Sequence, residues 1–517
     1  MKKRSFILIL AVLLVVSTVL TGCGTGKAAS AAAAENTTEK KDSINIAISS
    51  EPTTLDPMNG NDLLTFAIQY QIFDTLVRED QDGKLVPGLA EKWDISPDGT
   101  EITFNLRKGV KFQNGDEMTA DDVVFSFQRA IASSYTTRIT GSMDSIDAID
   151  ANTVKLKLKY PYGPILGCIA SANMGIVSKK AVEQNAEGFA RNPIGTGPYQ
   201  LVEWKTGDKL VFKSFKDYYR GEAAIKNLTY SIITDSSTAL VALEKGEMDQ
   251  MMSPAAADRK NIENNKDLKL YETPEASYLF VAFNTEKGLF TNKLLRQAVS
   301  YAIDRNSVIL GALEGTGTPL EVPIPPSCFG YPRDFKNNPY DPEKAKELLK
   351  EAGYPNGLKV KLRTMEGPTY AKPAEIIQEN LRVVGIDAEL EVMERGAYLK
   401  DVYTDCNYEI TVNIVSALVL DADLITYGRF YSGLVGGGNN FTRFRNDEMD
   451  KALDLGRKSL SEQERMDAYL KVCQIVKDEA PLVPVMSGLR IIAANKNLAG
   501  VQAHSTMKYY VYDYHWE

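Results

Sequence analysis

Histidine is almost missing from this sequence of 517 residues. Its two histidines, His504 and His515, both lie near the C-terminus. A zinc site built from histidines or a Ser-His-Asp triad would therefore have few residues to draw on. Because no nucleophile and base can be paired by motif, we predict that the protein is not an enzyme and that it holds no metal or other cofactor.

Paired cysteines, basic runs and late apolar segments are missing too. No CxxC pair occurs, and spacing alone cannot show whether the internal cysteines form a disulfide; these are Cys168, Cys328, Cys406 and Cys473. The net charge is −9 without a basic run, which argues against binding to nucleic acid or directly to anionic lipid. Beyond the leader, no segment has about 18 consecutive apolar residues, so none is expected to span a membrane.

The start of the chain is its most informative part. Three cations at positions 2–4 precede an unbroken apolar run over residues 6–16, which has the length of a signal-peptide core. The sequence LTGC follows at 20–23 and resembles a bacterial lipobox. On that resemblance, residues 1–22 are a signal peptide and the sulfur of Cys23 carries a lipid. An uncleaved membrane anchor and an ordinary secretory signal are the alternatives.

Residues 23–43 form the predicted lipidated tether. Gly, Ala, Ser, Thr, Lys and Glu dominate this stretch, which cannot bury enough apolar surface to fold alone. Removal of the leader would leave about 495 residues, too many for one hydrophobic core, so we expect two or more domains. It would also remove three cations and leave a net charge of about −12.

Apolar spacing predicts the main elements of the first half. Residues 63–77 have helical spacing, residues 93–108 alternate around a PDG turn as in a β-hairpin, and residues 153–159 alternate as in a strand. Thr119 begins the sequence TADD, which resembles a capping box at the start of a helix.

The second half has a different rhythm. Residues 278–283 form a continuous apolar run typical of a buried strand. A strand at 358–362, a helix at 374–384 and a strand at 386–392 then follow one another with short connections. This order is typical of a βαβ unit, and we predict a mostly parallel sheet that binds its ligand in a crevice beyond the strand ends.

Motifs spread over nearly the whole chain resemble one family. They are, in order, LAEKW (89–93), SPDGT (96–100), TFNLRKGVKF (103–112), NG (114–115), TADDV (119–123), GTGPY (195–199), RQA (296–298), AIDR (302–305), YDP (340–342) and APLVP (480–484). Together they strongly resemble extracytoplasmic solute-binding protein family 5, the dipeptide-, oligopeptide- and nickel-chelate-binding lipoproteins of bacterial ABC importers. GTGPY lacks the Lys-Ser/Thr pair of a phosphate loop, so we do not expect it to bind phosphate.

The resemblance implies an α/β, two-lobed periplasmic-binding-protein-like fold (type II, cluster C) with an extra inserted domain and a hinge. Lobe one is expected to be discontinuous and to comprise residues 44–62, 192–277 and 485–517. The extra domain is expected at 63–191 and lobe two at 278–484. The ligand would lie between the lobes, which would close on it by a shift between open and closed states.

The resemblance also points to two ligand-binding regions. In oligopeptide receptors, the stretch beyond the motif LDP (55–57) pairs edge-on with the peptide backbone. Here this stretch falls on Asn61, Asp62 and Leu63. The alternative is that Asn61 or Asp62 only caps a helix.

The second region is a predicted strand over 414–420, with Ser416 and Leu418, and the loop that follows it. Peptide receptors carry an acidic residue there that pairs with the α-amino group of the ligand. This sequence has LDADL at 420–424, with shortened spacing and no proline, so Asp421 is the first candidate and Asp423 the second. Helix capping by either aspartate is the alternative.

A strict dipeptide clamp is not expected. Dipeptide receptors place an arginine before the helix that would start here near Pro373. The matching stretch MEGPTY (365–370) has no arginine, and Arg363 lies on the preceding strand. A longer peptide, or a ligand that does not need this contact, fits the sequence better.

The resemblance therefore implies a monomeric extracytoplasmic receptor, lipid-anchored to the outer face of the cell membrane. It would deliver peptides, and oligopeptides first, to the permease subunits of an ABC importer. Opines, oligosaccharides and a nickel chelate are the alternative ligands in the same role. A peptide-pheromone sensor and a surface hydrolase are the alternatives from other classes. No nucleic-acid partner is expected, and the lipid is the only expected contact with the membrane.

Overall fold

A computed structural model describes residues 41–80, 83–436 and 439–517. The predicted signal peptide, Cys23 and most of the predicted tether lie outside the described residues. Residues 41–517 form one compact unit. Within the described ranges, no helix combines the length and the apolar character needed to cross a membrane.

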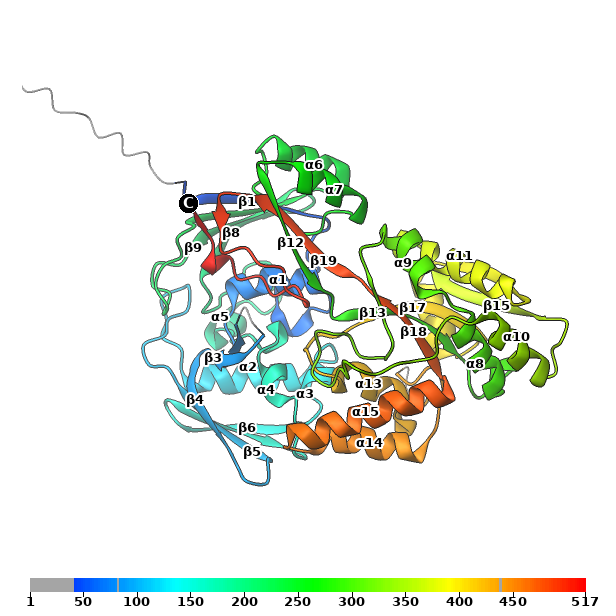
Figure 1. Ribbon diagram of the computed structural model, residues 1–517. Helices are drawn as coiled ribbons and strands as arrows, with labels where there is room; N and C mark the ends of the chain where they lie inside the picture. Colours follow the sequence, from blue (N-terminus) through cyan, green and yellow to red (C-terminus); the bar gives the residue numbers. More distant parts are fainter. Residues whose placement is uncertain (1–40, 81–82, 437–438) are drawn as a thin grey trace, which may run out of the picture. The chain divides into compact units, whose positions relative to one another are not determined.

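The first lobe is built on a seven-stranded sheet whose strands come from the start, the middle and the end of the chain (Figure 1). In spatial order the strands are β12 (Leu268–Pro274), β19 (Leu489–Asn495), β11 (Gln250–Met251), β1 (Ser43–Ile48), β10 (Asn227–Ile232), β9 (Lys209–Ser214) and β8 (Tyr199–Lys205). Strand β1 runs parallel to β10 and β11, and the other neighbours are antiparallel. The short elements of this lobe are α6 (Ser236–Glu244), α7 (Arg259–Asn264), β20 (Leu498–Ala499) and β21 (His515–Trp516). Strands β2 (Val77–Glu79) and β3 (Leu85–Pro87) form a separate two-stranded sheet.

The second lobe is built on a six-stranded sheet. Its spatial order is β14 (Thr318–Pro319), β18 (Leu482–Ser487), β13 (Ser277–Phe283), β17 (Ile410–Ser416), β15 (Leu358–Met365) and β16 (Ile386–Met393). The predicted βαβ unit is confirmed, because β15 and β16 are parallel and α11 (Pro368–Val383) connects them. The prediction of a mostly parallel sheet is wrong. Strand β13 takes the chain away from the first lobe and β18 brings it back, so these neighbours are antiparallel, as are β13 and β17.

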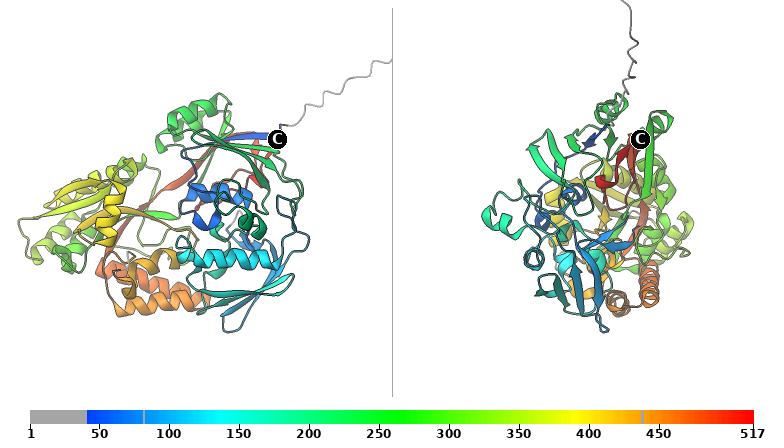
Figure 2. Two further views of the ribbon diagram at one scale, coloured as in Figure 1. Left: turned by 180° about the vertical axis from the view of Figure 1, so that it is seen from behind. Right: turned by 90° about the vertical axis from the view of Figure 1, so that its left-hand side faces the viewer.

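Helices cover both faces of the second sheet (Figure 2). They are α8 (Lys293–Ala302), α9 (Arg305–Leu313), α10 (Pro342–Glu351), α11, α12 (Arg395–Tyr398), α13 (Asp423–Phe430), α14 (Asp447–Lys458) and α15 (Glu462–Glu479). Along β13, Tyr278 and Phe280 belong to the core that includes α14 and α15 residues, whereas Leu279 and Val281 belong to the core under α8 to α11. Successive side chains point to opposite faces of a strand, so a strand buried on both faces must be apolar throughout. This explains the continuous apolar run predicted to be a buried strand.

A four-stranded sheet lies in the segment between β3 and β8. Its order is β4 (Ala90–Ile95), β5 (Glu101–Leu106), β7 (Thr153–Leu158) and β6 (Met143–Asp150), with helices α2 (Ala120–Ala132), α3 (Thr137–Thr140), α4 (Ile165–Ile169) and α5 (Lys179–Gln184). The predicted hairpin and the capping box of Thr119 with Asp122 are confirmed. Ile102 and Phe104 share one buried core with Ile44 and Ile46 of β1. The predicted limits of this segment, which we call the inserted segment, stay a prediction.

Two helix predictions need correction. Helix α1 (Leu63–Ile72) ends five residues early because the carbonyl of Ile72 accepts a hydrogen bond from Gly197 N at 2.8 Å. A Cβ at Gly197 would lie 2.5 Å from the backbone of Ile72, so the GTGPY motif serves this close approach. Helix α11 begins at Pro368 rather than at 374, because proline is well tolerated in a first helical turn.

Two adjacent crossovers join the lobes at the predicted hinge. One connects β12 to β13 through Glu275, and the other connects β18 to β19 through Gly488. Glu275 N donates to Gly488 O at 3.0 Å, and the Glu275 carboxylate pairs with Arg490 at 3.1 Å. These contacts hold the two crossovers together, side by side.

A buried ion pair fixes the C-terminal tail to the end of β2. The Lys508 ammonium contacts the Glu79 carboxylate, and these side chains are 1% and 4% exposed. His504 Nε2 lies 3.1 Å from the same carboxylate. Burial alone would raise the pKa of Glu79, but Lys508 and His504 outweigh it and lower the pKa to about 2.

We predict that this carboxylate makes folding stability depend on pH. Because the folded-state pKa is depressed, its stabilisation is present above about pH 4.5 and is lost as the pH falls toward 2, by about 3 kcal/mol. Glu79→Gln should therefore lower the unfolding free energy at pH 7 and by progressively less at acid pH. Denaturant unfolding at several pH values measures this. Glu187→Gln, at an exposed position, is the matched control. If Glu79→Gln lowers the unfolding free energy by the same amount at every pH, the prediction is contradicted.

Candidate functional site

The first predicted ligand-binding region lies at the start of α1. Asp62 caps this helix: its carboxylate accepts hydrogen bonds from Thr65 N at 2.8 Å and from the Thr65 hydroxyl at 2.7 Å. The capping alternative is therefore confirmed for Asp62. Asn61 is exposed and Leu63 is half-buried. Contact of these residues with a ligand stays a prediction.

The structure brings Leu63 and Leu418 into one apolar cluster. The two leucines are half-buried and pack with Tyr510 against Phe66, Tyr70 and Ala172. Strand β17 ends at Ser416 instead of 420, because its last pairing partner is Ser277, where β13 begins. The freed residues 417–420 form a loop that carries Leu418 to this cluster. Half-exposed apolar side chains from distant parts of the chain suit the apolar part of a ligand.

Asp421 has a cationic partner from the chain itself. Arg465 Nη2 donates to the two carboxylate oxygens of Asp421 at 2.8 and 2.7 Å, and Arg465 Nε donates to Gly456 O. Asp423 N also donates to Asp421 at 3.0 Å. Burial raises the pKa of Asp421 despite the arginine. The predicted role in binding an ammonium group therefore requires the ligand to share this carboxylate with Arg465.

Asp423 joins the second lobe to the inserted segment. Its carboxylate accepts hydrogen bonds from Arg457 Nε at 2.8 Å, from Arg457 Nη2 at 2.9 Å and from the Tyr162 hydroxyl at 2.7 Å. The Arg457 guanidinium also lies 3.2 Å from the ring centroid of Tyr427. With 1% of its side chain exposed, Asp423 has no free face for a ligand in this conformation. Its predicted ligand contact stays a prediction.

A pocket of about 390 Å³, which we call the arginine pocket, opens beside this junction. The inserted segment contributes Thr137, Arg138, Gly141, Ser142, Tyr160 and Tyr162, and the second lobe contributes Tyr403, Asp423, Leu424, Tyr427, Gly428, Arg429, Leu434, Asn439 and Arg457. Desolvation and the neighbouring charge of Arg429 lower the pKa of Arg138 to about 10. The lining combines aromatic walls with positive charge.

A larger hollow of about 580 Å³ lies at the crossovers. Its lining includes Leu313, Lys372 and the paired side chains of Glu275 and Arg490. The Nε of Arg490 and the hydroxyl of Tyr278, which belong to this lining, are buried and have no hydrogen-bond partner among the described residues.

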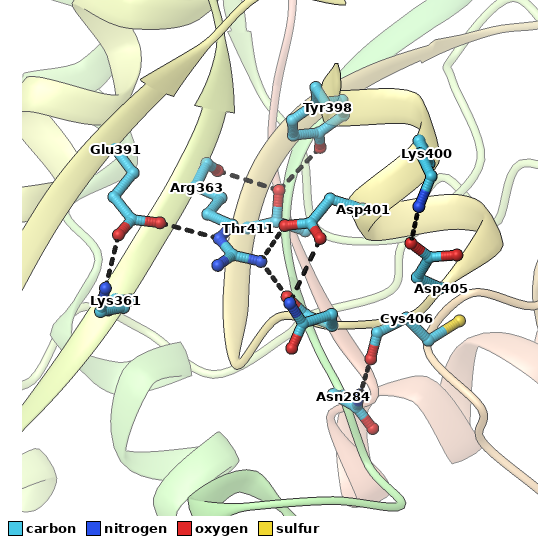
Figure 3. Close-up of polar contacts among 11 residues, drawn as sticks. Asn284, Lys361, Arg363, Glu391, Tyr398, Lys400, Asp401, Asp405, Cys406 and Thr411 are labelled. Carbon is cyan, nitrogen blue, oxygen red and sulfur yellow. Dashed lines mark hydrogen bonds and ion pairs between the residues drawn. The ribbon is translucent and has the colours of Figure 1, made fainter. Parts of the chain in front are cut away.

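Arg363 is not placed to clamp a ligand carboxylate. On β15, it forms ion pairs with Glu391, at 2.9 Å, and with Asp401 (Figure 3). It also donates to the backbone carbonyl of Asn407. These contacts lie within the second lobe, which agrees with the expectation that Arg363 does not replace the missing arginine of a dipeptide clamp.

The internal cysteines are separate, buried thiols. Cys168, Cys328, Cys406 and Cys473 are all free. Burial raises the pKa of Cys168, Cys328 and Cys473, which makes them poor nucleophiles. In the part of the chain that the structure describes, no group of His, Cys, Asp and Glu side chains has the arrangement of a metal site.

The sequence did not reveal the arginines of the site. Arg457 and Arg465 lie on charged helices, where arginines usually face solvent, and their aspartate partners are 34 and 44 positions away. Arg138 and Arg429 belong to none of the recognised motifs. The unusual Asp-x-Asp pair at 421–423 was the available signal, because two buried carboxylates need two cations.

Comparison with known proteins identifies the family. The family model described as "Bacterial extracellular solute-binding proteins, family 5 Middle" matches residues 84–436. Heme-binding protein A of Haemophilus influenzae is 30% identical over 81% of this chain and 82% of its own. Glutathione-binding protein GsiB of Shigella dysenteriae is 31% identical over 88% of this chain and 91% of its own length.

A solved structure agrees with these relatives. The periplasmic binding protein DppA of Helicobacter pylori, in complex with the peptide STSA, superposes with a TM-score of 0.80 at 29% identity, over 92% of this chain and 98% of that chain. Members of this family are substrate-binding receptors of transporters and not enzymes. The chain belongs to the family 5 bacterial extracellular solute-binding proteins of ABC importers.

Proposed function

We propose that this protein is a lipid-anchored receptor that captures a small solute between its lobes and delivers it to the permease of an ABC importer. The observation that supports this most is the arginine pocket, which is lined by the inserted segment on one side and by the second lobe on the other. Ligand held there would contact both parts of the chain, so it would favour the closed arrangement. The receptor acts as a monomer in this proposal.

The proposed ligand is a peptide, as the resemblance of the motifs implies. Similar proteins are named for heme and glutathione, and one is bound to the tetrapeptide STSA. The arginine pocket is near the lower end of the range of small-molecule sites, about 300–1,000 Å³, which favours a short peptide over a long one. Opines, oligosaccharides and a nickel chelate are the alternatives, and a peptide-pheromone sensor is the alternative to import.

The lipid anchor gives the first prediction of this proposal. Cys23→Ala should abolish lipid attachment, so the protein should leave the membrane fraction or accumulate with its leader uncut. Fractionation and intact mass measure the two results. Ser30→Ala, in the same segment, is the matched control and should behave as the parent. A correctly cut Cys23→Ala protein that stays on the membrane would exclude the lipid.

Closure of the lobes gives the second prediction. A solute that raises the melting temperature with increasing concentration binds the folded state, by mass action. The same solute should decrease the radius of gyration in X-ray scattering, because the crossovers at Glu275 and Gly488 allow the lobes to approach. Saturating solute with an unchanged scattering profile would argue against a closing cleft.

The structural role of Asp421 can be measured by stability. If Asp421 mainly neutralises Arg465, Asp421→Asn should destabilise the ligand-free protein by about 3–5 kcal/mol, because the arginine stays buried without its partner. Adding Arg465→Met should recover part of this loss. Asp387→Asn, which breaks an exposed pair with Lys359, should change the unfolding free energy by less than about 1 kcal/mol.

The ammonium-binding role of Asp421 predicts a further result. Because Arg465 binds Asp421 in either case, the loss of stability in Asp421→Asn would remain. The variant would in addition weaken the binding of a free-amine peptide while sparing the N-acetylated form. Calorimetry with the two peptides on the same variant tests this role, and equal losses for both peptides would contradict it.

A further inference from the structure

The arginine pocket concentrates positive charge in an acidic protein. Its lining contains Arg138, Arg429 and Arg457 but one carboxylate, that of Asp423. Asp423 is engaged by Arg457 through two hydrogen bonds. Two arginines therefore remain without a carboxylate partner among the described residues, although the whole chain carries a net charge of −9.

Backbone carbonyls supply the hydrogen-bond partners of these two arginines. Arg138 Nη2 donates to Leu424 O at 2.8 Å, and Arg429 Nη1 donates to Ile425 O at 3.3 Å. The Nε of Arg429 is buried and has no hydrogen-bond partner in the part of the chain that the structure describes. A guanidinium group has five N–H donors, so most donors of each arginine are left for another molecule.

This arrangement is unfavourable in an empty pocket. The charges of Arg138, which is exposed, and of Arg429, which is half-buried, repel each other, and the unsatisfied buried Nε of Arg429 adds a further penalty. The carboxylate of the lining, that of Asp423, is already bound by Arg457 through two hydrogen bonds. A bound anion would offset both terms, and the planar fork of a guanidinium matches a carboxylate with two parallel hydrogen bonds.

We propose that the arginine pocket binds a small organic acid, whose carboxylate groups contact Arg138 from the inserted segment and Arg429 from the second lobe. The inference rests on the proposed receptor function and specifies its ligand as a carboxylate-bearing solute. Tyr403 and Tyr427 supply rings against which the rest of the molecule packs. Because Arg138 belongs to the inserted segment and Arg429 to the second lobe, one bound acid would contact both parts of the chain.

Anion titration of charge variants tests the proposal. Arg138→Gln and Arg429→Gln each remove one charge and keep a hydrogen-bond donor. Arg382→Gln is the matched control, because Arg382 is 72% exposed on α11 and pairs with Glu379. The probes are citrate and inorganic phosphate, each compared with chloride at the same ionic strength. The melting temperature and calorimetry report binding.

We expect citrate to raise the melting temperature of the parent protein in a saturable manner. Each pocket variant should bind citrate more weakly by a factor on the order of 30 or more, whereas the control should bind like the parent. Without added anion, Arg429→Gln should melt at or above the temperature of the parent, because the repulsion is relieved. Arg429→Lys, which keeps the charge but loses the fork, should bind citrate with intermediate affinity.

Three results would overturn the proposal. One is a parent protein without a saturable response to citrate, and another is an equal response in the parent and in both pocket variants. The third is a saturable response to phosphate alone, which would assign the pocket to another class of anion. If the lobes close on a neutral N-acetylated peptide amide but the protein does not respond to citrate, the receptor function stands and the organic acid is excluded as its ligand.

Discussion

Two buried aspartate–arginine pairs fix the loop on which the rest of the site depends. Asp421 is held by Arg465 of α15, and Asp423 is held by Arg457 of α14. Removing one partner of such a pair costs about 3–5 kcal/mol, so the loop between β17 and α13 has little freedom. The loop in turn carries Leu418 to the apolar cluster. Through Tyr162, it also binds the inserted segment to the second lobe.

The same pairs determine where positive charge remains available. Arg457 and Arg465 are neutralised inside the protein, whereas among the described residues Arg138 and Arg429 each donate a single hydrogen bond, to a backbone carbonyl. The carboxylates of this loop thus support the structure, and in our proposal the unneutralised arginines next to it recognise the ligand. On that proposal, the receptor selects its ligand by charge and by the fit of a small molecule against tyrosine rings.

The sequence predicted features that depend on neighbouring residues. The hairpin around the PDG turn, the capping box at Thr119 and the buried strand β13 are each determined by a short pattern of polarity. Features set by distant residues were not predictable. The direction of β13 relative to β17 and β18 follows from how the chain enters and leaves the lobe, and the end of α1 follows from Gly197. Arg465 lies 44 positions from Asp421, and no local pattern joins them.

The cargo that the protein retains would test this account most directly. Native mass spectrometry of protein purified without added ligand, followed by release and identification of the bound molecule, measures its mass and its acidic groups. The account predicts a small solute that carries at least one carboxylate and that is lost from the Arg138→Gln, Arg429→Gln double variant. A retained cargo that is neutral or cationic, or that the double variant holds as firmly as the parent, would contradict it.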